Sequence, residues 1–136
     1  MANYKVDAVE GIGPVMGAKL RAAGIMDTDA LLEAVSTRTK RSMLAKTTEI
    51  SEKIILRFAN MVDLFRIKGV GPQYAELLEA SGVDTVKELA QRVPANLHKK
   101  MEEVNTSKNL SGRVPTEKEI IQWVEEAKEL PRTIEY

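Results

Sequence analysis

Apolar residues recur at helical spacing along most of the chain, so nearly all of it is predicted to be α-helical and the fold class to be all-α. The longest predicted helix spans Ser51–Ile67, where apolar residues follow i, i+4, i+7, i+8 and i+11: Ile54, Phe58, Met61, Val62 and Phe65. A second stripe predicts a last helix over Thr116–Leu130, with these residues on its buried face: Ile120, Trp123, Val124 and Ala127.

Residues typical of helix ends predict shorter helices on both sides of the longest one. Pro14 and Pro72 fit first helical positions, because proline lacks the N–H group that is unpaired there. Gly24 and Gly82 fit left-handed residues just after a helix. Further helices are expected from Thr28, over Ser36–Lys46, from Thr85 with Glu88 as a capping box, and over Pro94–Val104. Extended chain is expected only at the termini, over Tyr4–Val6 and Thr133–Tyr136.

The chain contains one pattern twice. "GIGPVMGAKLRAAGI" begins at Gly11, and "GVGPQYAELLEASGV" begins 58 residues later with six of fifteen positions identical. Farther along, Ile54 pairs with Ile120 at an offset of 66, so the second copy has about eight extra residues, which we assign to a surface loop at Asn105–Arg113. The predicted architecture is one compact domain of two pseudo-repeated units, 1–50 and 68–136, which share a long central helix, 51–67.

Each copy has a Gly-x-Gly-Pro turn in front of a helix, which is the pattern of a helix-hairpin-helix. The turns are Gly11-Ile12-Gly13 and Gly69-Val70-Gly71. Glycine lets the backbone turn sharply, and the start of the following helix favours an anion such as a phosphate. We expect Gly13 and Gly71 to exclude a side chain, through positive φ or a close contact.

These motifs resemble those of known families. The chain resembles tandem helix-hairpin-helix proteins, and "GVDTVKEL" after the second turn is similar to the C-terminal domain of the bacterial RNA polymerase alpha subunit and to recombinase N-terminal domains. "IKGVGPQYAELLEASGVDTVKELAQR", "LHKKMEEVN" and "RVPTEKEIIQWVEEAKELP" resemble more closely a family of small all-helical proteins with two such units, a domain of unknown function. The resemblance to this family implies an all-helical fold with two such units. The wider one implies DNA contacts at Gly11, Ile12, Gly13, Gly69, Val70 and Gly71.

Basic residues of the first copy are candidates for phosphate contacts. They lie in the helix after the first turn and in the run "TRTKRSMLAK": Lys19, Arg21, Arg38, Lys40, Arg41 and Lys46. Val15 and Gln73 follow the turn prolines, where DNA-binding hairpins often have lysine. The second turn is followed by Glu76 and Glu79, which disfavour a phosphate. We therefore expect any nucleic-acid contact at the first turn, and a solvated helix face is the other interpretation of the basic run.

Composition narrows the function classes. Lys plus Arg equals Asp plus Glu at 20 each, so the net charge does not favour nucleic acid. The chain has no cysteine and one histidine, His98, and no nucleophile with a partner base or phosphate-binding loop, so no enzyme activity, metal, cofactor or small-molecule substrate is expected. It has no signal peptide and no apolar stretch of membrane-spanning length, so we expect a cytoplasmic protein without a membrane partner.

Two functions stay open at this point. In the first, the turns and the basic residues bind the backbone of DNA or RNA without sequence specificity. In the second, the turns are purely structural and the chain is a protein-interaction or assembly module, through a protein partner or self-association. In either case the last helix lacks a following turn, and we expect it to pack beside Pro14–Ala23 and close the two copies into a ring, either within one chain or across a dimer.

Overall fold

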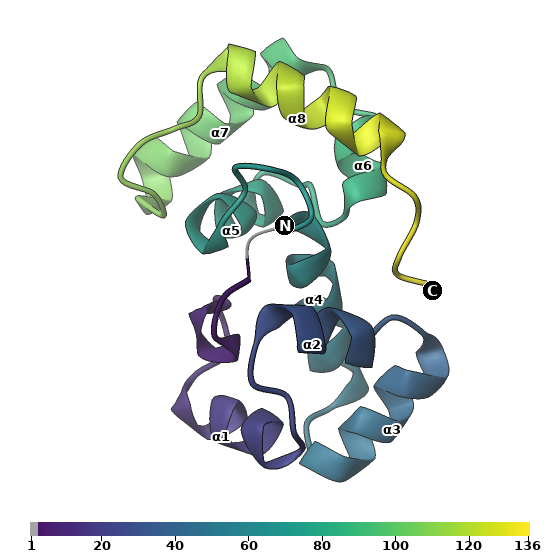
Figure 1. Ribbon diagram of the computed structural model, residues 1–136. Coiled ribbons are helices and arrows are strands. Elements are labelled where there is room, and N and C mark those ends of the chain that lie inside the picture. The colour runs from purple at the N-terminus through teal and green to yellow at the C-terminus, as the bar shows by residue number, and fades with distance from the viewer. Residues whose placement is uncertain (1–2) are drawn as a thin grey trace. The chain divides into compact units, whose positions relative to one another are not determined.

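The computed structural model describes residues 3–136 and is all-helical, as predicted (Figure 1). A short 3-10 helix, η1 (Val6–Ala8), precedes eight α-helices. These are α1 (Pro14–Ala22), α2 (Thr28–Ala34), α3 (Arg38–Thr48), α4 (Glu52–Leu64), α5 (Pro72–Ala80), α6 (Val86–Ala90), α7 (Pro94–Lys108) and α8 (Glu117–Glu129). Within residues 3–136 the only β-type contact is an isolated antiparallel bridge between Lys5 and Asp27, so the expected extended segments form no strand.

The helices form two compact units. Among the described residues, the N-terminal unit comprises 3–63 together with Arg132–Tyr136, and the C-terminal unit comprises Leu64–Pro131. The prediction of one compact domain, with units 1–50 and 68–136 around a shared helix, stays a prediction. Apart from Leu64, α4 belongs to the N-terminal unit, and the last five residues belong to that unit as well.

Proline marks the start of both α1 and α5, and glycine follows their ends, as predicted. Pro14 and Pro72 are the first residues of the two helices. Gly24 and Gly82, just beyond their ends, have φ of +87° and +93°, which lie in the left-handed region. The leucines predicted to face inward are fully buried, Leu20 in α1 and Leu78 in α5, and Leu77 of α5 is fully buried as well. Local chemistry therefore determines both the ends and the inward face of these helices.

Two side chains cap the next helices of the N-terminal unit. The carboxylate of Asp27 accepts a hydrogen bond from the N–H of Ala30 at 2.8 Å, so α2 is capped one residue before the predicted Thr28. The hydroxyl of Thr37 caps α3, which therefore begins and ends two residues later than the predicted Ser36–Lys46.

Helix α4 has a continuous buried face that differs from the prediction at its start. Ile55 is fully buried, whereas Ile54 is only partly buried. The later members of the stripe are buried as predicted: Phe58, Met61, Val62 and Phe65. Helix α4 ends at Leu64, before the predicted Ile67, and with 13 residues it is shorter than α7, which has 15.

Helix α7 continues beyond the predicted Val104. It runs into the segment that we assigned to a loop and ends at Lys108, and the next residue, Asn109, has a φ of +50°. The side chain of Asn105 accepts a hydrogen bond from the N–H of Ser111 at 2.9 Å and donates one to its carbonyl at 3.0 Å. The extra residues of the second copy therefore first lengthen a helix and then form a short loop that is fixed to it.

Helix α8 has the predicted start and the predicted buried face. Thr116 and Glu119 form the reciprocal bonds of a capping box. The stripe is buried: Ile120, Trp123, Val124 and Ala127. Helix α8 packs on α6 and α7 of its own unit. Neighbouring helices of the same unit therefore already bury its apolar face, which removes the reason for the expectation that it packs beside Pro14–Ala23.

Candidate nucleic-acid interface

The first glycine turn connects η1 to α1. The carbonyl of Val9 accepts a hydrogen bond from the N–H of Ile12 at 3.0 Å, and Gly11 between them has a φ of +91°. Ile12 is buried, whereas Gly13 is exposed, and beyond its two chain neighbours no residue would lie within 4 Å of a Cβ atom on Gly13. The turn thus keeps its apolar side chain inside and exposes its backbone at the start of α1.

The second turn, between α4 and α5, has the same backbone conformation. The carbonyl of Ile67 accepts a hydrogen bond from the N–H of Val70 at 3.1 Å, and Gly69 has a φ of +90°. Val70 is buried, as Ile12 is. Gly71 is the N-cap of α5, as Gly13 is of α1. The similar sequences of the two turns therefore correspond to similar local structures.

The backbone conformation requires glycine at the first position of each turn and not at the second. Gly11 and Gly69 are left-handed, a conformation that other residues rarely adopt. Gly13 and Gly71 have φ of −80° and −103°, which any residue adopts. The prediction that positive φ excludes a side chain at Gly13 and Gly71 is wrong, and at Gly13 the surrounding space is also open.

A cation lies against the first turn. A Cβ atom on Gly11 would lie 2.5 Å from Nη1 of Arg57, a residue of α4. Next to this guanidinium, α1 begins without a side-chain cap and without an acidic residue in its first turn. The unpaired N–H groups at a helix start carry partial positive charge. The first turn therefore combines a cationic side chain with an exposed helix start.

An indole and a carboxylate lie against the second turn. A Cβ atom on Gly69 would lie 3.4 Å from Nε1 of Trp123 in α8, and the Trp123 ring packs on Tyr74 with 5.4 Å between ring centroids. The N–H of Lys68 donates a hydrogen bond to the carboxylate of Glu126 at 2.9 Å, also from α8. A side-chain anion thus already occupies one backbone donor of this turn, and its charge disfavours a phosphate there.

The predicted contacts Lys19 and Arg21 lie away from the start of α1. Both are in its last turn, and a helix rises about 1.5 Å per residue, so roughly 8 to 10 Å along the axis separates them from Pro14. Arg21 forms an ion pair with Asp7 at 3.5 Å. The structure therefore places the backbone of both residues beyond the first turn of α1, with the Arg21 guanidinium beside Gly17.

Arg41 is a structural residue rather than a surface cation. Its side chain is buried, with 6 % of the residue exposed. The guanidinium donates hydrogen bonds to the carbonyls of Val35 at 2.8 Å and Glu135 at 2.7 Å, and it lies 5.9 Å from the ring centroid of Tyr136. These contacts do not favour the predicted phosphate contact of Arg41, because backbone carbonyls already accept hydrogen bonds from both terminal nitrogens of its guanidinium.

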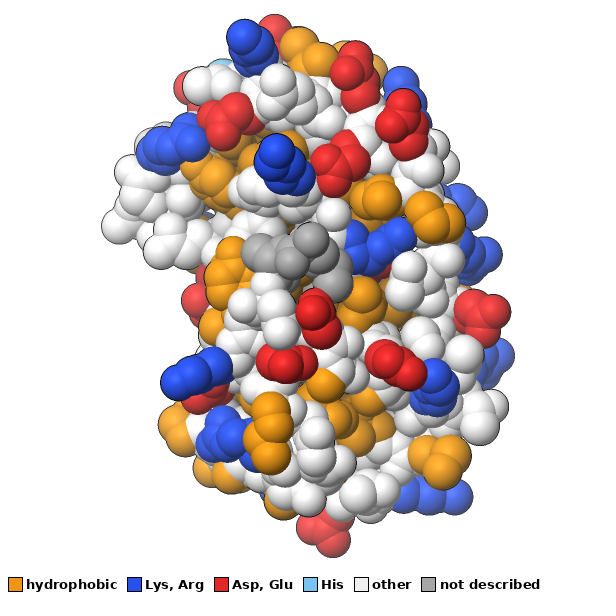
Figure 2. Space-filling view, in the orientation of Figure 1, with side chains coloured by type: hydrophobic (Ala, Val, Ile, Leu, Met, Phe, Trp, Pro, Cys, Tyr) orange, Lys and Arg blue, Asp and Glu red, His pale blue; other side chains and the backbone are white. Residues whose placement is uncertain are grey.

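The other basic residues of α3 are on the surface. Arg38, Lys40 and Lys46 are exposed, and the ammonium of Lys40 donates to the carbonyl of Glu33 at 3.3 Å. Together α1 and α3 contain six basic and no acidic residues, whereas α5 contains two acidic and no basic ones. Over the face in Figure 2, however, basic and acidic side chains are interspersed, so any positive surface is local.

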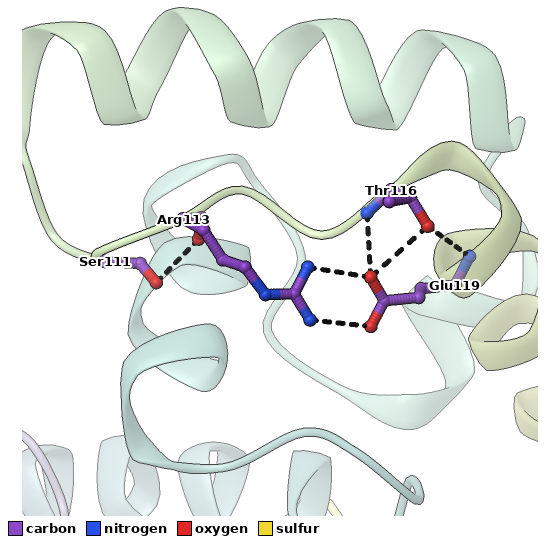
Figure 3. Close-up of polar contacts among 4 residues, drawn as sticks. All are labelled: Ser111, Arg113, Thr116 and Glu119. Carbon is purple, nitrogen blue, oxygen red and sulfur yellow. Dashed lines mark hydrogen bonds and ion pairs between the residues drawn. The ribbon is translucent and has the colours of Figure 1, made fainter.

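A polar network fixes the start of α8 (Figure 3). The guanidinium of Arg113 donates two hydrogen bonds to the carboxylate of Glu119, at 2.9 and 3.1 Å, and the N–H of Thr116 donates a third at 3.1 Å. The bonds from Arg113 and then from Thr116 lower the pKa of Glu119 to about 2. The hydroxyl of Ser111 donates to the Arg113 carbonyl at 2.8 Å. Because these groups satisfy one another, we interpret the network as structural.

Sequence reasoning missed Arg57 as a residue of the first turn. Its signal was present in the repeat, because the offset of 66 that pairs Ile54 with Ile120 also pairs Arg57 with Trp123. Each of these two side chains lies against the left-handed glycine of its own unit. The offset relates Arg57 to Trp123, whereas the contact of each side chain with its glycine is known only from the structure.

Residues 3–136 contain no group of three or more His, Cys, Asp or Glu side chains arranged to hold a metal ion. None of the helices in this part of the chain is long and apolar enough to cross a membrane.

Comparison with other proteins adds a family to this description. Neither the search of curated proteins nor the search of solved structures found a match. Residues 10–130, which include both glycine turns and all eight α-helices, match a family described as a domain of unknown function, DUF4332. The chain therefore belongs to the DUF4332 family.

Proposed function

We propose that the protein is a non-catalytic module that binds the phosphate backbone of nucleic acid, without sequence specificity, through its first glycine turn. In this proposal Gly11, Ile12 and Gly13 form the hairpin of a helix-hairpin-helix, and Arg57 supplies the cation. The second turn, Gly69 to Gly71, has a structural role. A cytoplasmic location belongs to the same proposal.

The contrast between the two turns carries the proposal. The two turns share a backbone conformation. The guanidinium of Arg57 lies against the first turn, whereas the indole of Trp123 and the carboxylate of Glu126 lie against the second. A phosphate oxygen at the first turn would meet a cation and the N–H groups of an exposed helix start, which together favour an anion. At the second turn it would meet a fixed negative charge.

The exposed part of α3 supports the same assignment. Arg38, Lys40 and Lys46 are exposed and have no acidic neighbour within their helix. Such residues add attraction to a polyanion that depends on salt rather than on base sequence. Because the whole chain is neutral, we expect weak binding that is evident only at low ionic strength.

A protein-interaction module is the second candidate, and one observation favours it. The N-terminal unit exposes large apolar side chains, with Val15 70 %, Met43 64 % and Met26 56 % exposed. Val15 lies directly after the turn proline. In this alternative the turns are purely structural, and the apolar side chains contact a protein partner.

A binding titration separates the two candidates. Labelled duplex DNA and single-stranded RNA are titrated with the protein at low salt, with anisotropy as the readout. About four phosphate contacts on duplex give a log–log slope against salt near −3 to −4. Arg57→Glu should weaken binding roughly tenfold or more and reduce the slope by about 1.

Lys99→Glu is the matched control, because it makes the same type of charge reversal at an exposed residue of the C-terminal unit. Equal losses for both variants would show an effect of net charge and would reject the first turn as the site. No binding of the parent protein to either nucleic acid at roughly 100 μM would reject nucleic-acid binding and leave the protein-interaction candidate.

A further inference from the structure

The last five residues, Arg132–Tyr136, form a tail that docks on the N-terminal unit, although it follows α8 of the C-terminal unit. The tail has no regular secondary structure (Figure 1). Its Glu135 pairs with the N-terminal unit through the backbone. The N–H of Glu135 donates to the Ser36 carbonyl at 2.8 Å, and its carbonyl accepts from Arg41 at 2.7 Å.

Side chains on both sides of Glu135 add to this docking. Ile134 is buried, with 2 % of the residue exposed. The hydroxyl of Tyr136 donates to the side-chain oxygen of Asn60 at 2.6 Å. The tail is therefore held by the buried Ile134 side chain, by the hydrogen bond from the Tyr136 hydroxyl, and by two hydrogen bonds to the backbone of Glu135. The residues of the N-terminal unit that contact it, Ser36, Arg41 and Asn60, are called the tail site below.

The connection between α8 and the tail is short and extended. Leu130 has φ −73° and ψ 134°, and Pro131, whose carbonyl accepts a hydrogen bond from Arg66, follows it. None of the contacts in the tail site involves this connection. A tail that arrives from another molecule can therefore form the same bonds in the same site.

We propose that the tail site accepts the tail of a second molecule of this protein, and that reciprocal exchange of tails closes a symmetric dimer. The exchanged dimer preserves every tail contact of two separate molecules, so its population depends on concentration rather than on new contacts. A short tether gives the molecule's own tail an effective concentration on the order of 1 mM, so exchange becomes substantial as the protein approaches that concentration.

The absence of native cysteine makes a direct test practical. A backbone N–H···O bond keeps two Cα atoms within about 6 Å, which lies within disulfide range, so residues 36 and 135 are suitable for cross-linking. Ser36→Cys and Glu135→Cys are introduced into separate full-length chains, one of them isotopically labelled. The mixture is incubated, diluted and treated with a short bifunctional thiol reagent, and mixed dimers are identified by mass.

We expect the yield of mixed dimer to rise roughly tenfold or more as the incubation concentration increases from about 10 μM to about 1 mM. Adding Ile134→Asp to the Glu135→Cys chain is the matched control, since it disables the donated tail and leaves the accepting chain unchanged. A mixed-dimer yield no higher than in this control overturns the proposal.

The double variant Ser36→Cys/Glu135→Cys gives a second readout in one chain. Internal closure at low concentration, together with mixed dimers from the single variants at high concentration, supports exchange. Internal closure without mixed dimers shows that the tail docks only on its own molecule and overturns the proposal. The absence of both products shows that the tail does not occupy the site and overturns it as well.

Discussion

At the first glycine turn the guanidinium of Arg57 lies against Gly11, and at the second the indole of Trp123 lies against Gly69. The two turns have matching backbone bonds and nearly equal φ at these glycines. Their surroundings differ because each turn meets a side chain from a helix that comes more than 40 residues later in the sequence. The comparison teaches that glycine and proline specify the shape of a turn, whereas a distant helix specifies what the turn is able to bind.

The largest expected effect is on the free energy of unfolding, and it distinguishes Trp123, the structural partner of the second turn, from Arg57, the proposed functional partner of the first. Trp123→Ala should lower the free energy of unfolding by about 3 to 5 kcal/mol, because it removes a buried aromatic side chain and leaves a cavity. Arg57→Ala should change it by less than about 1 kcal/mol, because Arg57 is on the surface.

Urea unfolding followed by far-UV circular dichroism measures both variants, since Trp123 is the only tryptophan and its fluorescence is lost with it. Comparable losses for the two variants would break the comparison, because Arg57 would then be as structural as Trp123.

The next effect concerns the two glycines within one turn. Gly11→Ala should cost about 1 to 2 kcal/mol, because alanine disfavours left-handed backbone and its Cβ atom would displace the Arg57 guanidinium. Gly13→Ala should stay within about 0.5 kcal/mol of the parent, because its φ is ordinary and its surroundings are open. Thermal melts of this matched pair provide the measurement, and a greater loss for Gly13→Ala would contradict the assignment.

The smallest expected effect is a pH-dependent change in stability at the start of α8, which differs chemically from the start of α4. Near α4, the hydroxyl of Ser51 accepts a hydrogen bond from the N–H of Ile54, whereas α8 has the carboxylate of Glu119 in its capping box. Because the pKa of Glu119 is lowered to about 2 from 4.5, it adds stability that is present above 4.5 and is lost as the pH falls toward 2.

Glu119→Gln should therefore lie below the parent in melting temperature near neutral pH, and this difference should shrink between about pH 5 and pH 2. Melting temperatures of both proteins across this range test the expectation. A difference that is independent of pH would show that the charge of Glu119 does not contribute.

Features with a local chemical cause were predictable from the sequence. Pro14 begins α1, Gly24 is left-handed after it, and Thr116 with Glu119 caps α8, all as predicted. Each of these depends on one or two residues within a single turn of chain, so no knowledge of packing was needed. The buried stripe of α8 was also correct, because its spacing leaves only one apolar face.

Features that depend on distant residues were not predictable in the same way. Arg41 looked like a surface cation in a basic run, and its burial depends on Glu135 and Tyr136, which lie 94 and 95 residues later. Ile54 and Ile55 are adjacent apolar residues, and only packing decides that the second is fully buried. The position of Arg57 at the first turn likewise follows from how α4 packs within its unit.

The docking of the tail has a consequence for how the protein is made. Arg41 leaves the ribosome 94 residues before Glu135, whose carbonyl it binds in the finished molecule. At roughly 5 to 20 residues per second, about 5 to 20 s pass before that partner is synthesised. During this interval the nascent N-terminal unit lacks Ile134 and the backbone partners of the tail. Folding of this unit is therefore completed only after Ile134 and Glu135 are translated, so vectorial synthesis cannot complete the N-terminal unit before the C-terminal unit is made.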